Sequence, residues 1–339
     1  MCWCTVTARD GSERMTAPIG IGIVGVGRMG SDHARIIRRR VPSARLVGLA
    51  DVDVAAARRL ADELGVDRIH ASAGELAADP AVQGVIIATS TSRHLEVVRA
   101  IAAERRDILC EKPLALTLAD TDAAIAAAET ARVRLQVGFM RRFDPDYRQA
   151  HDALASGACG RPIVFSSLQF DGSPPPLAYA DPAVSGGIMV DMGVHEFDLA
   201  RWLIGDEVVE VHAWGSAVAF PELATVDDVD SAVITLRYRS GALGIVALTR
   251  FNAAGDEVRT EVQGTTGSVH YGQRLVVGEV HEHIFERAYA AQAEAFVAAL
   301  RDDRDVEVGG ADARAAFLIA VAADRARRGG RPVLVSSVG

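Results

Sequence analysis

Apolar runs and amphipathic segments alternate along the first 140 residues of the chain. Short runs of consecutive apolar residues predict buried strands at residues 19–24, 44–50, 85–88, 108–110 and 135–139. The segments between them carry apolar residues at helical spacing, which predicts helices from the first strand to about residue 40 and at residues 54–64, 94–103 and 117–131. Strands that are apolar throughout and alternate with helices are typical of a parallel, doubly wound sheet.

The pattern changes after about residue 140. Several segments favour strands, some by alternating apolar and polar residues one by one, and together they predict a half-buried, mainly antiparallel sheet; they are residues 163–170, 208–218, 231–238, 243–249, 258–263 and 268–271. Helices are predicted at residues 144–155, 189–203, 284–300 and 311–327. Helices on one face of a sheet leave the other face needing cover, so we expect a homo-oligomer, a dimer or tetramer, that forms through this sheet.

A glycine-rich turn joins the first predicted strand to the helix after it. Its sequence is Gly25-Val26-Gly27-Arg28-Met29-Gly30, the GxGxxG spacing of dinucleotide-binding folds. The first glycine permits the tight turn, the second lets the backbone approach a pyrophosphate, and the third lets the helix pack close to the strand. The helix N-terminus then offers free N–H groups and the positive end of its dipole to the phosphates. We therefore expect this run, including Arg28 and Met29, to bind a dinucleotide.

An acidic residue selects the form of the cofactor. Asp51 ends the next strand, 21 residues beyond Gly30, where it can accept hydrogen bonds from both ribose hydroxyls. A 2′-phosphate would be repelled by Asp51 and Asp53, so NAD is predicted rather than NADP. Residues 18–140 are accordingly predicted to form a Rossmann NAD-binding domain within an α/β fold.

The rest of the chain completes the predicted domain organisation. Residues 141–339 are expected to form an α/β domain for substrate binding and oligomerisation, whose C-terminal helix is able to pack back on the first domain. Residues 1–17 are expected to be a disordered leader, because Met15 lies just before the first strand and is an alternative start to Met1.

Polar residues follow two further strands at the edge of the sheet where α/β proteins place ligands. Thr89 and Ser90 follow the strand at residues 85–88, where they either line the cofactor site or cap the helix that opens at His94. Glu111 and Lys112 follow the strand at residues 108–110. We expect all five residues to lie beside the cofactor.

Lys112 is the only lysine of the chain, beside 35 arginines. An ammonium is compact and its pKa moves on burial, whereas a guanidinium is broad and permanently charged, so the two do not replace each other where chemistry is involved. The alternative is chance survival in an arginine-rich chain. We predict that Lys112 polarises the oxygen of a substrate.

A second cluster of titratable residues lies between positions 186 and 198. Asp191, His195 and Asp198 stand at i, i+4 and i+7, so one stripe of a continuous helix would carry all three. We predict His195 as general base, Asp191 as its orienting partner, and Asp198 as a ligand of substrate hydroxyls. Two alternatives remain: a core histidine satisfied by its neighbouring aspartate, and a metal pair. We predict no metal, because no third ligand stands out.

Composition and charge exclude several classes of protein. The chain has 339 residues, 49% of them hydrophobic, and a formal net charge of −9, which argues against a nucleic-acid or anionic-membrane partner. No apolar stretch approaches the roughly 20 residues that span a bilayer. The four cysteines show no metal or redox spacing, so we expect a reduced, cytoplasmic protein.

These motifs together resemble the glucose–fructose oxidoreductase/inositol dehydrogenase/MocA family. The resemblance covers residues 19 to 334, and its features are the glycine turn, Glu111-Lys112-Pro113, and Gly186-Gly187 with Asp191 and His195. It implies a Rossmann domain, a C-terminal domain with an open sheet, a Lys-Asp-His catalytic set and, often, dimers or tetramers.

Within that family the chain most resembles the inositol 2-dehydrogenases. The resemblance is carried by residues 138–144 and by the run from Asp191 to Asp198, and it implies that Arg141 borders the substrate. The chain departs from these enzymes at Gln169-Phe170-Asp171 and at Gly255-Asp256-Glu257, where substrate specificity would be set. Asp171 is included among the expected substrate-binding residues.

We therefore predict an NAD-dependent oxidoreductase. It would transfer hydride from a secondary hydroxyl of a cyclic polyol or sugar to NAD, in a reaction like that of inositol 2-dehydrogenases, with His195 taking the hydroxyl proton. Two alternatives remain open: an NAD-dependent glycoside hydrolase of the same fold, and a non-catalytic NAD(H) sensor.

Overall fold

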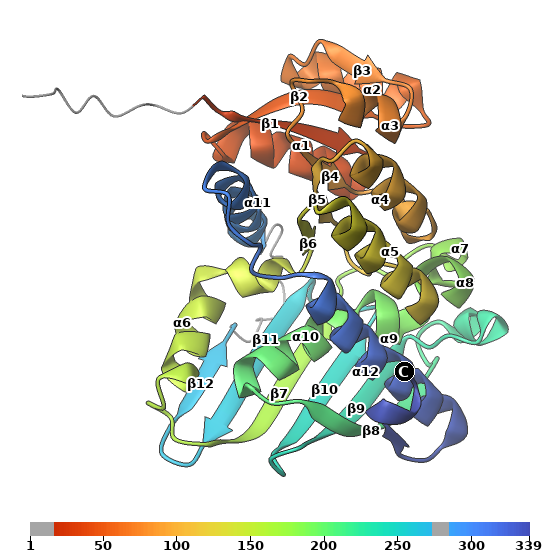
Figure 1. The fold of residues 1–339 in the computed structure, drawn as a ribbon. Coiled ribbons are helices and arrows are strands. Elements are labelled where there is room, and N and C mark those ends of the chain that lie inside the picture. The colour runs from red at the N-terminus through yellow and green to blue at the C-terminus, as the bar shows by residue number, and fades with distance from the viewer. Residues whose placement is uncertain (1–16, 273–284) are drawn as a thin grey trace, which may run out of the picture.

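The computed structural model describes residues 17–272 and 285–339. Sixteen of the seventeen residues of the predicted leader, and the first residue of the helix predicted at 284–300, lie outside this part. The described residues build two sheets, each with its own helices, and Figure 1 shows the N-terminal sheet above the larger C-terminal one. No helix in the described ranges is long and apolar enough to cross a membrane.

The N-terminal sheet has six parallel strands in the order β3-β2-β1-β4-β5-β6. Its strands are β1 (Ile19–Val24), β2 (Ala44–Ala50), β3 (Arg68–His70), β4 (Gly84–Ile87), β5 (Asp107–Cys110) and β6 (Leu135–Val137). The connecting helices are α1 (Arg28–Arg40), α2 (Val54–Leu64), α3 (Ala73–Ala78), α4 (His94–Ala103) and α5 (Leu118–Ala131). The chain reverses its direction of strand addition between β1 and β4, and ligands of doubly wound sheets bind at such a switch point.

A helix from the far end of the chain completes this layer. α11 (Glu286–Arg301) packs beside α1, where Figure 1 draws it in dark blue against the red strands. Its Phe296 and Val297 are fully buried in one cluster with Ile21 of β1. The N-terminal core therefore depends on a segment contributed from beyond residue 285.

The C-terminal sheet has seven strands in the order β12-β11-β7-β10-β9-β8-β13. They are β7 (Pro162–Phe170), β8 (Val208–Ser216), β9 (Ser231–Tyr238), β10 (Leu243–Thr249), β11 (Glu257–Gly264), β12 (Ser268–Tyr271) and β13 (Val333–Leu334). Only β7 and β10 pair in parallel. The prediction of a mainly antiparallel second sheet is thus confirmed.

Helices cover one face of this sheet, as Figure 1 shows for α10 and α12. The helices of this half are α6 (Pro145–Ala155), α7 (Leu177–Ala180), α8 (Pro182–Ser185), α9 (Gly187–Asp191), α10 (Gly193–Ile204) and α12 (Gly310–Gly329). Alternate residues of β9 point into this layer and are buried, whereas the residues between them are exposed. The alternation arises because successive side chains of a strand point to opposite faces.

Candidate active site

The glycine turn has the geometry that a pyrophosphate requires. Gly25 has a φ of +88°, and a Cβ there would lie 2.6 Å from the Ala88 carbonyl oxygen. A Cβ on Gly30 would lie 1.8 Å from the Gly25 carbonyl oxygen, so α1 could not pack this closely with any side chain at that position. A Cβ on Gly27 would meet no atom within 4 Å, which leaves open space above the start of α1. No side chain caps this helix, so its first N–H groups face that space.

Asp51 lies beside this turn, at the end of β2. Its Oδ2 accepts a hydrogen bond from the Val26 backbone N–H at 2.6 Å, and its Oδ1 accepts one from the Asp53 N–H at 2.8 Å. These bonds fix a carboxylate next to the opening above α1. The glycines and Asp51 therefore fit the pyrophosphate and the adenosine ribose of a dinucleotide.

The loops after β4 and β5 are joined by His94. The ring is 1% exposed, with Nδ1 3.0 Å from the Pro113 carbonyl oxygen and Nε2 3.2 Å from the Thr89 carbonyl oxygen. Burial lowers the pKa of His94. Both ring nitrogens thus face protein backbone, and His94 shapes the predicted cofactor site by fixing two loops. Thr89 is half-buried and Ser90 is exposed at the same strand end.

Glu111 connects the end of β5 to α1 through its side chain. Its Oε1 lies 2.6 Å from Nε2 of the buried His33 on α1, and its Oε2 accepts the Lys112 N–H at 3.2 Å. Burial alone would raise the pKa of Glu111, but the hydrogen bond from His33 and the charges of His33 and Lys112 lower it. His33 has no outstanding sequence signal beyond following the glycine turn, and sequence reasoning missed it.

The predicted continuous helix over residues 189–203 is wrong, because the helix breaks at Met192. α9 ends at Asp191 and α10 begins at Gly193, and the His195 N–H bonds to the Met192 carbonyl rather than to that of Asp191. The free Asp191 carbonyl accepts a hydrogen bond from Lys112 Nζ at 2.8 Å. Lys112, which follows β5, and Asp191, at the end of α9, therefore meet directly through a backbone contact that the sequence could not show.

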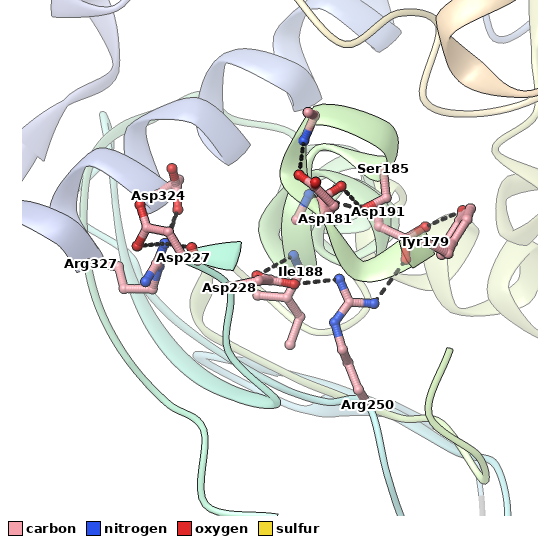
Figure 2. Close-up of polar contacts among 12 residues, drawn as sticks. Tyr179, Asp181, Ser185, Ile188, Asp191, Asp227, Asp228, Arg250, Asp324 and Arg327 are labelled. Atoms are coloured by element: carbon pink, nitrogen blue, oxygen red, sulfur yellow. Dashed lines mark hydrogen bonds and ion pairs between the residues drawn. The ribbon is translucent and has the colours of Figure 1, made fainter. Parts of the chain in front are cut away.

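The carboxylate of Asp191 is bound by two residues that sequence reasoning missed. Oδ2 accepts a hydrogen bond from a terminal nitrogen of Arg250 at 3.1 Å, and Oδ1 accepts one from the Tyr179 hydroxyl at 3.1 Å. Lys112 Nζ is 3.7 Å from Oδ1. Figure 2 shows Arg250 between Asp191 and Asp228. Nothing in the sequence distinguishes Arg250 among 35 arginines or Tyr179 in its proline-rich loop.

His195 is buried close to these groups without contacting Asp191. The residue is 6% exposed, and within the described residues no hydrogen bond joins it to Asp191 and its buried Nδ1 has no partner. The expected orienting contact is therefore replaced by packing, with the Phe139 ring edge-on at 6.1 Å between centroids. Burial, together with the positive charges of Lys112 and Arg141, holds the pKa of His195 well below its usual range.

Arg141 and Asp198 each form a buried ion pair, with Glu196 and Arg142 respectively. Arg141 is 2% exposed and binds Glu196 and the side-chain oxygen of Gln169. Asp198 accepts a hydrogen bond from Arg142 at 2.8 Å, and a second nitrogen of Arg142 bonds to the other oxygen. Both oxygens of Asp198 are thus used by protein, contrary to the expectation that they bind substrate hydroxyls. Arg141 keeps only an electrostatic influence on His195.

Asp171 lies close enough to Lys112 and Asp191 for their charges to act on it. Burial raises its pKa, the carboxylates of Asp256 and Asp191 act in the same direction, and Lys112 opposes them. Gln169 donates a hydrogen bond to its Oδ1 at 3.2 Å, and no residue within 17–272 and 285–339 hydrogen-bonds to Oδ2. Asp171 therefore fits the predicted role of a ligand for substrate hydroxyls.

Comparison with known proteins identifies the two halves separately. Residues 19–139 match the oxidoreductase family with an NAD-binding Rossmann fold, and residues 147–270 match the GFO/IDH/MocA C-terminal domain. The myo-inositol 2-dehydrogenase of Thermotoga maritima is 35% identical over 94% of this chain and 99% of its own length. The scyllo-inositol 2-dehydrogenase (NAD(+)) of Bacillus subtilis is 32% identical over 94% of this chain and 97% of its own.

Solved structures give the same assignment. A probable dehydrogenase from Thermotoga maritima superposes with a TM-score of 0.90 at 34% identity, over 95% of this chain and all of that one. The scyllo-inositol dehydrogenase of Lactobacillus casei, solved with bound NAD(H) and scyllo-inositol, gives 0.86 at 26% identity, over 94% of this chain and 99% of that one. With its glycine turn, its Asp51 and its Lys112–Asp191 contact, the chain belongs to the GFO/IDH/MocA family of oxidoreductases, and NAD is its cofactor.

Proposed function

We propose that this protein is an NAD-dependent dehydrogenase that oxidises a secondary hydroxyl of a cyclic polyol, in a reaction like that of inositol 2-dehydrogenases. The observation that carries the proposal is the contact of the sole lysine, Lys112, with Asp191. It lies after the carboxyl end of β5 and near the buried His195. The inositol dehydrogenases among its relatives support the choice of a polyol.

Each side chain of the site has a separate role in the proposed oxidation. The glycine turn and Asp51 would hold NAD, which when bound would supply the acceptor for the hydride. Lys112 donates a hydrogen bond to the substrate oxygen and stabilises negative charge as it develops there. His195 takes the hydroxyl proton, for which it must be neutral, and its lowered pKa keeps it neutral at physiological pH. Asp171 accepts hydrogen bonds from hydroxyl groups, whereas Asp191, whose carboxylate is bound by Arg250 and Tyr179, orients Lys112 through its backbone carbonyl.

A panel of inositols and aldoses tests this assignment. We expect purified protein to form NADH with NAD and at least one inositol, read as absorbance of the reduced nicotinamide. NAD binding without NADH accumulation, but with cleavage of a glycoside, would instead support the hydrolase. NAD binding with neither reaction would leave the NAD(H) sensor.

The cofactor preference gives a separate prediction. In Asp51→Ser we expect the KM for NAD to rise at least tenfold and NADP to become a usable cofactor, because the carboxylate that binds the ribose and repels a 2′-phosphate is gone. Asp62→Ser, which removes an exposed carboxylate from α2, is the matched control and should behave as the unaltered protein. Equal use of NADP and NAD before any substitution would contradict the assignment of Asp51.

We also infer that two or four copies associate through the uncovered face of the C-terminal sheet. Apolar side chains are more than 40% exposed there on the neighbouring strands β8, β9 and β10; they are Trp214, Val233, Leu243 and Ile245. A two-fold axis would bring the same apolar strip of two copies together, and a monomer rarely exposes such a strip to water.

Light scattering after size exclusion tests this inference. We expect the unaltered protein to be a dimer or tetramer and the double variant Trp214→Asp/Ile245→Asp to be a smaller species, because buried unpaired carboxylates oppose association. Ala311→Asp, on the exposed surface of α12, is the control. A monomeric parent protein at micromolar concentration would contradict the inference.

We place the reaction in the cytoplasm. Cys110 and Cys159 are both free and buried. Thiols that remain unpaired are typical of a reducing compartment.

A further inference from the structure

Arg250 follows β10 and is almost fully buried, at 1% exposure. One terminal nitrogen of its guanidinium bonds to Asp191 Oδ2 at 3.1 Å, and the other bonds to Asp228 Oδ2 at 2.8 Å. The planar fork of a guanidinium suits this bridge between two carboxylates, whereas a lysine ammonium is a single point charge. Arg250 is thus set between one carboxylate of the proposed active site and one carboxylate outside it.

Asp228 ties this bridge to the start of the same short helix. Its second oxygen, Oδ1, accepts the Ile188 backbone N–H at 3.1 Å, in the first turn of α9. Arg250 meanwhile binds the side chain of Asp191 at the last residue of α9. The pair Arg250–Asp228 therefore holds both ends of α9, and Figure 2 shows these bonds. The last carbonyl of this helix, that of Asp191, accepts the hydrogen bond from Lys112.

The distances at Lys112 show what this bridge accomplishes. Lys112 Nζ lies 2.8 Å from the backbone carbonyl oxygen of Asp191 but 3.7 Å from the nearer carboxylate oxygen. A free carboxylate beside an ammonium in a partly buried site would close on it, since their attraction is strong where water is scarce. Here the carboxylate is already held by Arg250 on one oxygen and by Tyr179 on the other.

We propose that Arg250 is a positioning residue that draws the Asp191 carboxylate away from Lys112. Lys112 is then oriented by a neutral carbonyl and keeps N–H donors for the substrate oxygen. The inference rests on the proposed dehydrogenase function. Arg250 touches neither the substrate oxygen nor the cofactor in this scheme, and it acts only through Asp191.

The sole lysine provides a test that needs no substrate. Trace acetylation with acetic anhydride labels a single ε-amine in this chain, and mass spectrometry of the peptide containing Lys112 separates it from the α-amino group. In Arg250→Met the released carboxylate should move from its present 3.7 Å into hydrogen-bonding distance of Lys112 Nζ, so we expect the labelling rate to fall at least threefold. Arg201→Met on α10, which breaks the partly buried pair of Arg201 with Glu207, should leave the rate unchanged. An unchanged or increased rate in Arg250→Met would overturn the proposal.

Loss of Arg250 also leaves the buried carboxylate of Asp228 without its ion-pair partner, and an unpaired buried charge lowers the stability of the fold. The double variant Arg250→Met/Asp228→Asn removes that charge, and we expect the same fall in labelling. A normal thermal transition of this variant together with an unchanged labelling rate would equally overturn the proposal.

Kinetics add a readout that a purely structural role would not produce. With NAD and a reactive inositol, we expect Arg250→Met/Asp228→Asn to lower kcat at least tenfold while the Kd for NAD stays within twofold. Placing both changes in an Asp191→Asn background should cause little further loss, because Arg250 acts through Asp191. Losses that multiply would show an independent role and overturn the proposal. If no inositol reacts with the unaltered protein, the proposed function fails, whereas the labelling experiment still decides the role of Arg250.

Discussion

Lys112→Arg should lower turnover by about 10²- to 10³-fold, the usual effect of removing a donor that stabilises a developing oxyanion. Charge is conserved in this variant, but the guanidinium is broader than the ammonium and would fork onto the Asp191 carboxylate, which lies 3.7 Å from Lys112 Nζ. The donor would then point at protein instead of substrate. Initial rates of NADH formation at saturating NAD and inositol measure the effect.

Two controls separate loss of chemistry from loss of binding. NAD affinity, measured by titration of the protein, should be unchanged, because the glycine turn and Asp51 lie on other loops. Arg314→Lys, at an exposed ion pair with Asp122, makes the reverse exchange outside the site and should be silent. Turnover equal to that of the parent protein in Lys112→Arg would remove the central catalytic assignment.

His195→Gln should lower kcat by about 10²- to 10⁴-fold, the range expected when a general base is lost. An amide of similar size keeps the packing against Phe139 but cannot take a proton. Stopped-flow or steady-state NADH formation quantifies the loss. A decrease of less than threefold would mean that another group accepts the hydroxyl proton.

The pH profile of the parent protein checks the same residue. Because burial and the charges of Lys112 and Arg141 lower the pKa of His195, the base stays unprotonated as the pH falls through 6.5. We expect kcat/KM to be flat there and to decline only at distinctly lower pH, where His195 finally binds a proton. An acidic limb centred at or above pH 6.5 would contradict this environment.

The architecture was largely readable from the sequence. The strands at residues 19–24, 44–50, 231–238 and 243–249 have the bounds predicted from their apolar runs and alternation. Burial on one or both faces of a sheet dictates side-chain polarity residue by residue, so these signals are local. The short β3 and α3 gave no such signal, because three to six residues are too few to establish a period.

The features of the site were likewise predictable only in part. By itself the sequence determined the glycine turn and the carboxylate that ends β2, since each depends on residue type and spacing, and it predicted that the lone lysine and the titratable cluster serve one site. Only the tertiary structure decided that α9 stops at Asp191, that the freed carbonyl orients Lys112, and that Arg250 holds the carboxylate. These features depend on which side chains long-range packing places beside a buried charge. The residues that neighbour one arginine among 35 in the sequence do not indicate which carboxylate it will bind.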